Sequence, residues 1–214
     1  MSLIIDYQKI FFHIPKTGGN SFRSFLQNQS IYKLKEKSHK HATPDFFYGS
    51  LKRHSTQLLA PMKAITYEPI IFVRNPITWY ESWYKYQLSR GVVKWGGSRR
   101  YTQWHPISSL DNADFRSFSS FICSVYDSNP FFLTTLYSRY LTEQGSVVCR
   151  MEDLALNLEK ELMRMGLKKS KFKDFRYPIV RPSPKLEIVW SKKIRQKVVE
   201  NEGLIFERFR YGDR

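Results

Sequence analysis

The chain has 214 residues, of which 42% are hydrophobic and 16% aromatic, and its 35 basic and 19 acidic residues give a formal net charge of +16. This length suffices for one sizeable core, so we expect a single domain over residues 1–214. The apolar runs are too short to span a membrane, no targeting segment is evident, and the two cysteines form neither a disulfide framework nor a metal motif. These features favour a cytoplasmic protein without a transmembrane segment. The charge favours an anionic partner, such as a nucleotide, an acidic glycan, an anionic lipid or a nucleic acid.

The first recognisable unit is an apolar stretch, a glycine turn and a helix. Residues 10–14 are rich in isoleucine and phenylalanine and predict a buried strand. Gly18 and Gly19 allow a tight turn, and the apolar spacing beyond Ser21 predicts a helix that ends near Gln29.

The turn between this strand and helix has the features of an anion-binding loop. The N-terminus of a helix offers backbone N–H groups and a positive dipole end, and Lys16 adds a full positive charge. The lysine precedes the glycines instead of following them as in a Walker A motif, so ATP or GTP is not the first expectation. A glycine turn with a solvated lysine is the simpler alternative. The expected anion-binding residues are Lys16, Thr17, Gly18, Gly19, Asn20 and Ser21.

A polar, basic segment over residues 30–40 leads into two histidines, His39 and His41. Histidine has an ordinary pKa of about 6.5 and can take a proton from a hydroxyl group at neutral pH. We expect only one of the two histidines to act as the base. The alternative is that both are exposed polar residues of a basic loop.

A second strand is predicted over residues 70–73 and a helix over 76–89, with Asn75 as its cap. Arg74 then stands at the carboxyl end of a strand, the edge where open α/β sheets bind ligands. Ser82 lies about two turns into the helix. A guanidinium and a hydroxyl group in this arrangement suit a phosphate.

The rest of the chain alternates loops and helices around one further strand, which predicts the α/β class. Residues 91–113 are an irregular stretch with aromatic side chains and arginines, suited either to a polyol acceptor bearing negative charge or to a plain surface loop. Residues 168–185 are basic, contain prolines and predict another loop. The remaining predicted elements are a helix over 114–126, a helical run ending near Leu141, a strand over 146–150, a helix stopped at Gly166 and a final helix capped by Ser191.

Taken together, these segments resemble sulfotransferases of the bacterial and carbohydrate type, which use 3′-phosphoadenosine-5′-phosphosulfate (PAPS). Residues 15–21, Pro-Lys-Thr-Gly-Gly-Asn-Ser, are similar to the loop of that family that holds the 5′-phosphosulfate. Residues 71–76 with Ser82 are similar to its 3′-phosphate motif, although Trp79 stands where members often carry a second arginine. The resemblance extends to about Tyr211.

The resemblance implies a three-layer, P-loop-like α/β fold with a mostly parallel central sheet and helices on both faces. It implies transfer of a sulfuryl group from PAPS to a hydroxyl or amine group of an unidentified acceptor, a carbohydrate among the candidates. The product would be adenosine 3′,5′-bisphosphate (PAP), and no metal would take part. The resemblance implies that Lys16 and residues 17–21 bind the phosphosulfate, with Lys16 also acting in catalysis, and that Arg74 and Ser82 bind the 3′-phosphate. It implies that His41 takes the acceptor proton, with His39 as the other candidate. A loop with Arg181 and Ser183 would close over the nucleotide.

Other functions fit parts of the same sequence. A divergent P-loop nucleotide kinase or hydrolase would need Mg²⁺ and would prefer ATP. A basic nucleic-acid-binding protein would form salt-sensitive complexes, although no specific nucleic acid is expected. A glycan- or nucleotide-binding protein without catalysis is a further alternative. The segment 168–185 has its own alternative, a solvated linker.

Overall fold

The computed structural model describes residues 2–5, 9–28, 35–37, 41–48, 67–92, 106–143, 145–167 and 185–212. The chain divides into two compact units, each made of two separate segments. The first unit is formed by Met1–Val73 and Arg139–Val180, and the second by Arg74–Ser138 and Arg181–Arg214. A single-domain organisation therefore stays a prediction.

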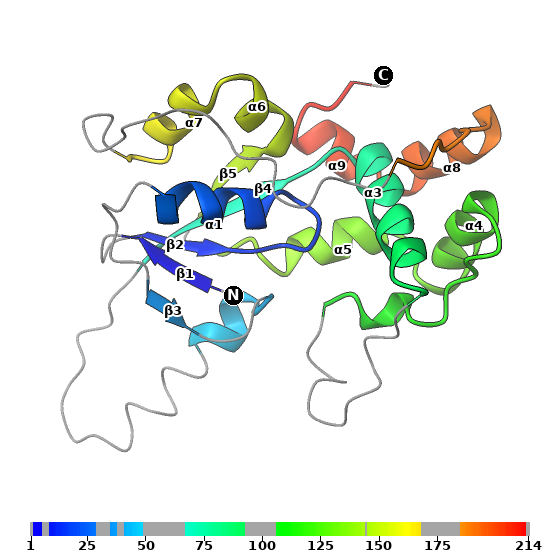
Figure 1. The fold of residues 1–214 in the computed structure, drawn as a ribbon, viewed down its shortest axis with the longest axis horizontal. Helices are drawn as coiled ribbons and strands as arrows, with labels where there is room; N and C mark the ends of the chain where they lie inside the picture. The colour runs from blue at the N-terminus through cyan, green and yellow to red at the C-terminus, as the bar shows by residue number, and fades with distance from the viewer. Residues whose placement is uncertain are drawn as a thin grey trace, which may run out of the picture. The chain divides into compact units, whose positions relative to one another are not determined.

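The first unit is built on a sheet whose described strands follow the order β3-β1-β2-β4-β5 (Figure 1). Strands β2, β4 and β5 run parallel, so that Phe11 pairs with Ile70 and Phe72 with Cys149. Strand β1 pairs antiparallel with both β2 and β3. The α/β class is thus confirmed, with a parallel part of three strands and an antiparallel part that the sequence did not predict. The strand bounds are β1 Ser2–Ile5, β2 Lys9–Phe12, β3 Lys35–Lys37, β4 Glu68–Val73 and β5 Val147–Arg150.

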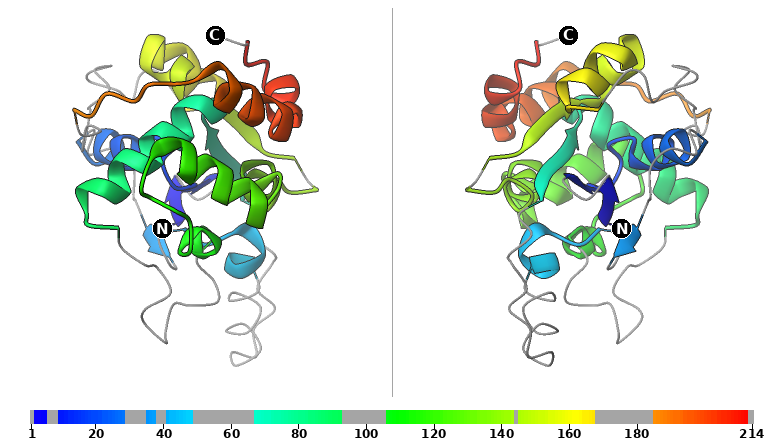
Figure 2. Two further views of the ribbon diagram at one scale, coloured as in Figure 1. Left: turned by 90° about the vertical axis from the view of Figure 1, so that its right-hand side faces the viewer. Right: turned by 90° about the vertical axis from the view of Figure 1, so that its left-hand side faces the viewer.

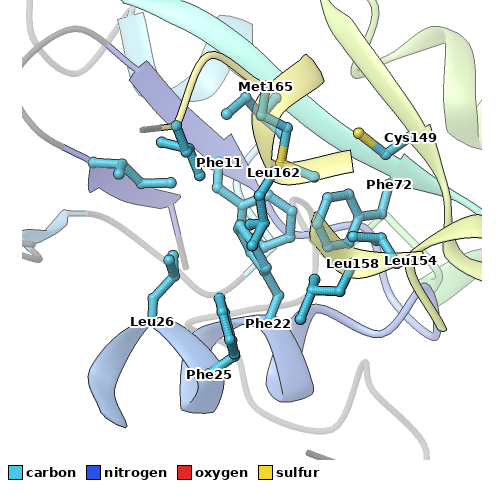
Figure 3. Close-up of a cluster of buried hydrophobic side chains, with 13 residues drawn as sticks. Phe11, Phe22, Phe25, Leu26, Phe72, Cys149, Leu154, Leu158, Leu162 and Met165 are labelled. Atoms are coloured by element: carbon cyan, nitrogen blue, oxygen red, sulfur yellow. The ribbon is translucent and has the colours of Figure 1, made fainter. Parts of the chain in front are cut away.

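Helices α1 (Gly19–Asn28), α6 (Met151–Leu156) and α7 (Leu158–Arg164) pack on one face of this sheet. The rings of Phe11, Phe22 and Phe72 meet there, with centroid separations of 4.7 to 5.0 Å. On the other face, Phe12 contacts Phe47 of the helical residues 44–48 at 5.8 Å. Figure 3 shows the buried cluster on the first face, which includes Phe11, Phe22, Phe25, Leu26, Phe72, Cys149, Leu154, Leu158, Leu162 and Met165.

The predicted helix before Gly166 is two short helices, α6 and α7, separated at Asn157. The Asn157 side chain accepts a hydrogen bond from the backbone N–H of Lys160 and so caps α7. Asparagine favours such a cap over a helix interior because its side chain competes for backbone hydrogen bonds. Leu154 and Leu158 are buried on either side of the break, so the buried apolar face continues from α6 into α7.

The second unit is helical in its described part (Figures 1 and 2). Helix α3 has the predicted bounds, and the Asn75 side chain accepts from the backbone N–H of Ile77 at 2.9 Å. Ser117 caps α4, which begins later than predicted, whereas Ser191 caps α8 as expected. None of the described helices has the length and apolar character needed to cross a membrane. The helices are α3 Pro76–Ser89, α4 Phe118–Ser128, α5 Phe132–Ser138, α8 Lys192–Asn201 and α9 Gly203–Arg208, with a 3₁₀ turn at Ser108–Leu110.

A fully buried carboxylate, that of Glu202, connects three parts of this unit. It accepts hydrogen bonds from the Tyr80 hydroxyl at 2.7 Å, the Leu133 N–H at 3.0 Å, and the Thr134 N–H and hydroxyl at 2.9 and 2.7 Å. Burial raises the pKa of Glu202, and these hydrogen bonds act in the opposite direction. The junction of α8 and α9 is thereby joined to α3 and to the start of α5.

Glu202→Gln should lower the free energy of unfolding by about 2 kcal/mol, because the new amide group would turn a donor toward buried N–H donors. Urea denaturation measures this change. Glu200→Gln is the matched control, since Glu200 lies exposed in the last turn of α8 and bonds only to Gln196 among the contacts described. Equal stability of the two variants would contradict the role assigned to Glu202.

Candidate functional site

Residues 13–18 form the turn between β2 and α1 that the sequence predicted. Lys16 has φ +66° and Gly18 has φ +82°, both in the left-handed region. Left-handed residues in a turn direct backbone N–H groups toward one side, and such concave turns bind anions. The Phe22 N–H donates to the Gly18 carbonyl at 3.1 Å, so the first turn of α1 begins at the loop. Helix geometry leaves the N–H groups of that turn without acceptors inside the helix.

The Thr17 side chain stabilises the shape of the loop. Its hydroxyl is buried and donates to the Ile14 carbonyl at 2.9 Å, closing the turn. A contribution of Thr17 to anion binding would therefore come from its backbone N–H. Ser21 is also buried, in the first turn of α1.

The ring of His13 lies directly against the first residue of α1. A methyl group on Gly19 would stand 2.2 Å from His13 Cδ2 and 2.5 Å from His13 Nε2, closer than any contact tolerates. Position 19 is therefore restricted to glycine by packing. His13 was not among the residues that the sequence predicted for the site, although it is the first residue of this turn.

His41 packs against His13. Nδ1 of His41 lies 2.9 Å from the His13 carbonyl oxygen, and the two ring centroids are 4.7 Å apart. The Tyr140 hydroxyl donates to the His41 carbonyl at 2.7 Å, and burial raises the pKa of Tyr140, which keeps this hydroxyl protonated. The side chain and the backbone of His41 are thus both held, beside the loop that follows β2. His39 lies outside the described residues.

Arg74 and Ser82 belong to the second unit. The Tyr137 hydroxyl accepts from the Arg74 N–H and donates to the Arg74 carbonyl, each at 3.0 Å. Arg74 Nε donates to the Thr78 hydroxyl at 2.9 Å, so a side-chain contact orients the guanidinium as well. Ser82 is only 4% exposed on α3.

The structure thus brings His41 and residues 16–21 into one unit, and Arg74 with Ser82 into the other. Arg181 and Ser183 lie outside the described residues, as do 93–105 of the predicted 91–113 loop. No group of three or more potential ligands from histidine, cysteine, aspartate and glutamate gathers to hold a metal in the part of the chain that is described. In chemical terms, the first unit offers donors for an anion and, next to them, an imidazole able to accept a proton.

Comparison with family models, with curated proteins and with solved structures finds no match to this chain. The loop geometry, the histidine contacts and the sequence motifs are therefore what any assignment of function rests on.

Gly19→Ala should lower the free energy of unfolding by about 1–3 kcal/mol, because the added methyl group must displace His13 or the start of α1. Gly203→Ala is a closely matched control: Gly203 is also the first residue of a helix, and no atom lies within 4 Å of the position its methyl group would take. Thermal and urea unfolding of the two variants compare them. If Gly19→Ala were as stable as the control, the close packing of His13 on α1 would be wrong.

Proposed function

We propose that this protein transfers a sulfuryl group from PAPS to a hydroxyl or amine group of an acceptor and releases PAP. The observation that carries the proposal is the His41 imidazole held beside an anion-binding turn at the N-terminus of α1. When bound, the donor supplies the sulfuryl group: the acceptor atom bonds to sulfur, the bond from sulfur to the 5′-phosphate oxygen breaks with its electron pair leaving on PAP, and the acceptor proton goes to His41.

The donor set of the loop fits a phosphosulfate. Lys16 and the N–H groups of residues 17–21 would hold the 5′ end of the nucleotide and neutralise the negative charge that grows on the leaving phosphate. Groups oriented before the reaction need no reorganisation during it, which makes such charge neutralisation effective. The buried Thr17 hydroxyl supports this role indirectly, because it fixes the turn.

Arg74 and Ser82 would hold the 3′-phosphate, the group that distinguishes PAPS from ordinary adenosine nucleotides. The contacts of Arg74 with Tyr137 and Thr78 support the proposal because they orient the arginine before a ligand binds. A planar guanidinium offers paired donors that suit phosphate oxygens. Arg181 and Ser183 remain proposed contacts to the nucleotide, from the resemblance alone.

The acceptor is proposed to be a polyol such as a carbohydrate, with anionic examples included, because the chain carries a net charge of +16. His41 would accept the proton of the attacking hydroxyl group. Its burial beside the loop would limit water in the reacting region, and electrostatic interactions are stronger where water is excluded.

Lys16→Met should abolish detectable release of PAP from PAPS in the presence of an acceptor mixture, because it removes the charge and keeps the length of the side chain. Lys160→Met, which removes an exposed charge from α7, should retain wild-type activity. The assay is chromatographic quantification of PAP. Wild-type activity in Lys16→Met would exclude the proposed role of the loop.

Arg74→Gln should weaken binding of PAP by about 10- to 100-fold, the loss expected for charge-assisted hydrogen bonds, and leave binding of AMP unchanged, because AMP lacks the 3′-phosphate. Isothermal titration calorimetry gives both affinities. Arg90→Gln, at the other end of α3, should change neither of them. A parallel loss of AMP binding in Arg74→Gln would show that Arg74 does not recognise the 3′-phosphate.

A further inference from the structure

We propose that Nε2 of His41 is the atom that takes the acceptor proton, and that His13 and Tyr140 are positioning residues that fix this choice. The identity of the proton donor rests on the function proposed above. The protonation pattern of the His41 ring does not, because it follows from contacts within the protein.

The contact between His41 and His13 defines which ring nitrogen carries hydrogen. A carbonyl oxygen can only accept a hydrogen bond, so at 2.9 Å from the His13 carbonyl Nδ1 of His41 must be the donor. A neutral imidazole has a single N–H group, which leaves the lone pair on Nε2. The neutral ring is therefore held as the tautomer in which Nε2 is the basic atom.

Tyr140 holds the backbone that carries this ring. Its buried hydroxyl donates to the His41 carbonyl at 2.7 Å, although the two residues are 99 positions apart in the sequence. Because Nδ1 of His41 is hydrogen-bonded to the His13 carbonyl and the His41 carbonyl to the Tyr140 hydroxyl, both the ring and the backbone of His41 are held in place. A flip of the ring by 180° would replace Nδ1 with a carbon atom and lose the bond to His13.

His13 connects this base to the anion-binding turn. Its ring packs on His41 at a centroid separation of 4.7 Å and also fills the space beside Gly19 at the start of α1. One imidazole thus contacts both the base and the helix end where the anion would bind. The distance between the base and that helix end is set by packing of the His13 ring.

The proton balance of the step needs no further reactant. The acceptor O–H or N–H bond breaks as the acceptor bonds to sulfur, and the proton forms an N–H bond at Nε2. The ring becomes an imidazolium cation, in which Nδ1–H still donates to the His13 carbonyl. The proton then leaves to solvent, and the neutral tautomer is restored.

The first test is the tautomer itself, read from long-range ¹H–¹⁵N correlation spectra of the uniformly ¹⁵N-labelled protein. The His41 signals are assigned by their loss in His41→Asn, whose amide N–H can replace Nδ1–H but which has no counterpart of Nε2. We expect the Nδ1–H tautomer in the wild-type protein. A predominant Nε2–H tautomer would overturn the inference whether or not the protein transfers sulfuryl groups.

The second test is kinetic and uses Tyr140→Phe, which removes only the hydroxyl group. We expect kcat to fall between about 10- and 100-fold with an unchanged affinity for PAP, because the base is displaced and the nucleotide contacts are not. Tyr48→Phe is the matched control: the Tyr48 hydroxyl also donates to a backbone carbonyl of the first unit, that of Tyr67, at 3.3 Å, and its loss should leave kcat unchanged. His41→Asn should lower kcat by about 10²- to 10⁴-fold and retain PAP affinity.

The outcomes separate the two proposals. An unchanged kcat in Tyr140→Phe would overturn the positioning role of Tyr140. If the wild-type protein showed the Nδ1–H tautomer and neither bound PAP nor released it from PAPS, the tautomer assignment would stand and the proposed function would fail.

Discussion

The ring of His13 occupies the space that a side chain at position 19 would need, and much of the candidate site depends on this one contact. It restricts the first residue of α1 to glycine and brings the end of β2 against the start of the helix. The His13 ring also packs against the His41 ring, and the His13 backbone carbonyl lies within hydrogen-bond distance of His41 Nδ1. The start of α1 and the His41 ring are therefore positioned by the same residue.

The fold of the first unit makes this contact possible. Phe11, Phe22 and Phe72 meet in the buried cluster, so that β2, α1 and β4 are held in fixed relation before any loop contact is considered. The turn between β2 and α1 then has little freedom, and the hydrogen bond from Thr17 to the Ile14 carbonyl removes more of it. A rigid scaffold beneath a short loop is what preorganised charge neutralisation requires.

The sequence predicted the elements whose signals are local. Strand β4 is a run of apolar residues buried on both faces, and α3 begins at a proline behind an asparagine cap, so both were recognisable. Strand β3, Lys-Glu-Lys, has no apolar residue. It is a strand because its backbone pairs with β1, and residue types alone do not predict that pairing. His13 and Tyr140 were missed for a similar reason: their roles come from contacts with a residue 28 and 99 positions away, which no periodicity reports.

The central claim is that the turn before α1 serves a nucleotide bearing phosphosulfate. Its most direct test is thermal unfolding of the whole chain with PAP compared with ATP plus Mg²⁺, each in equal excess. A ligand that binds only the folded state at 100 times its Kd stabilises that state by about 2.7 kcal/mol. The account predicts that PAP raises Tm and that ATP with Mg²⁺ raises it much less. A larger increase with ATP and Mg²⁺, or none with PAP, would contradict it.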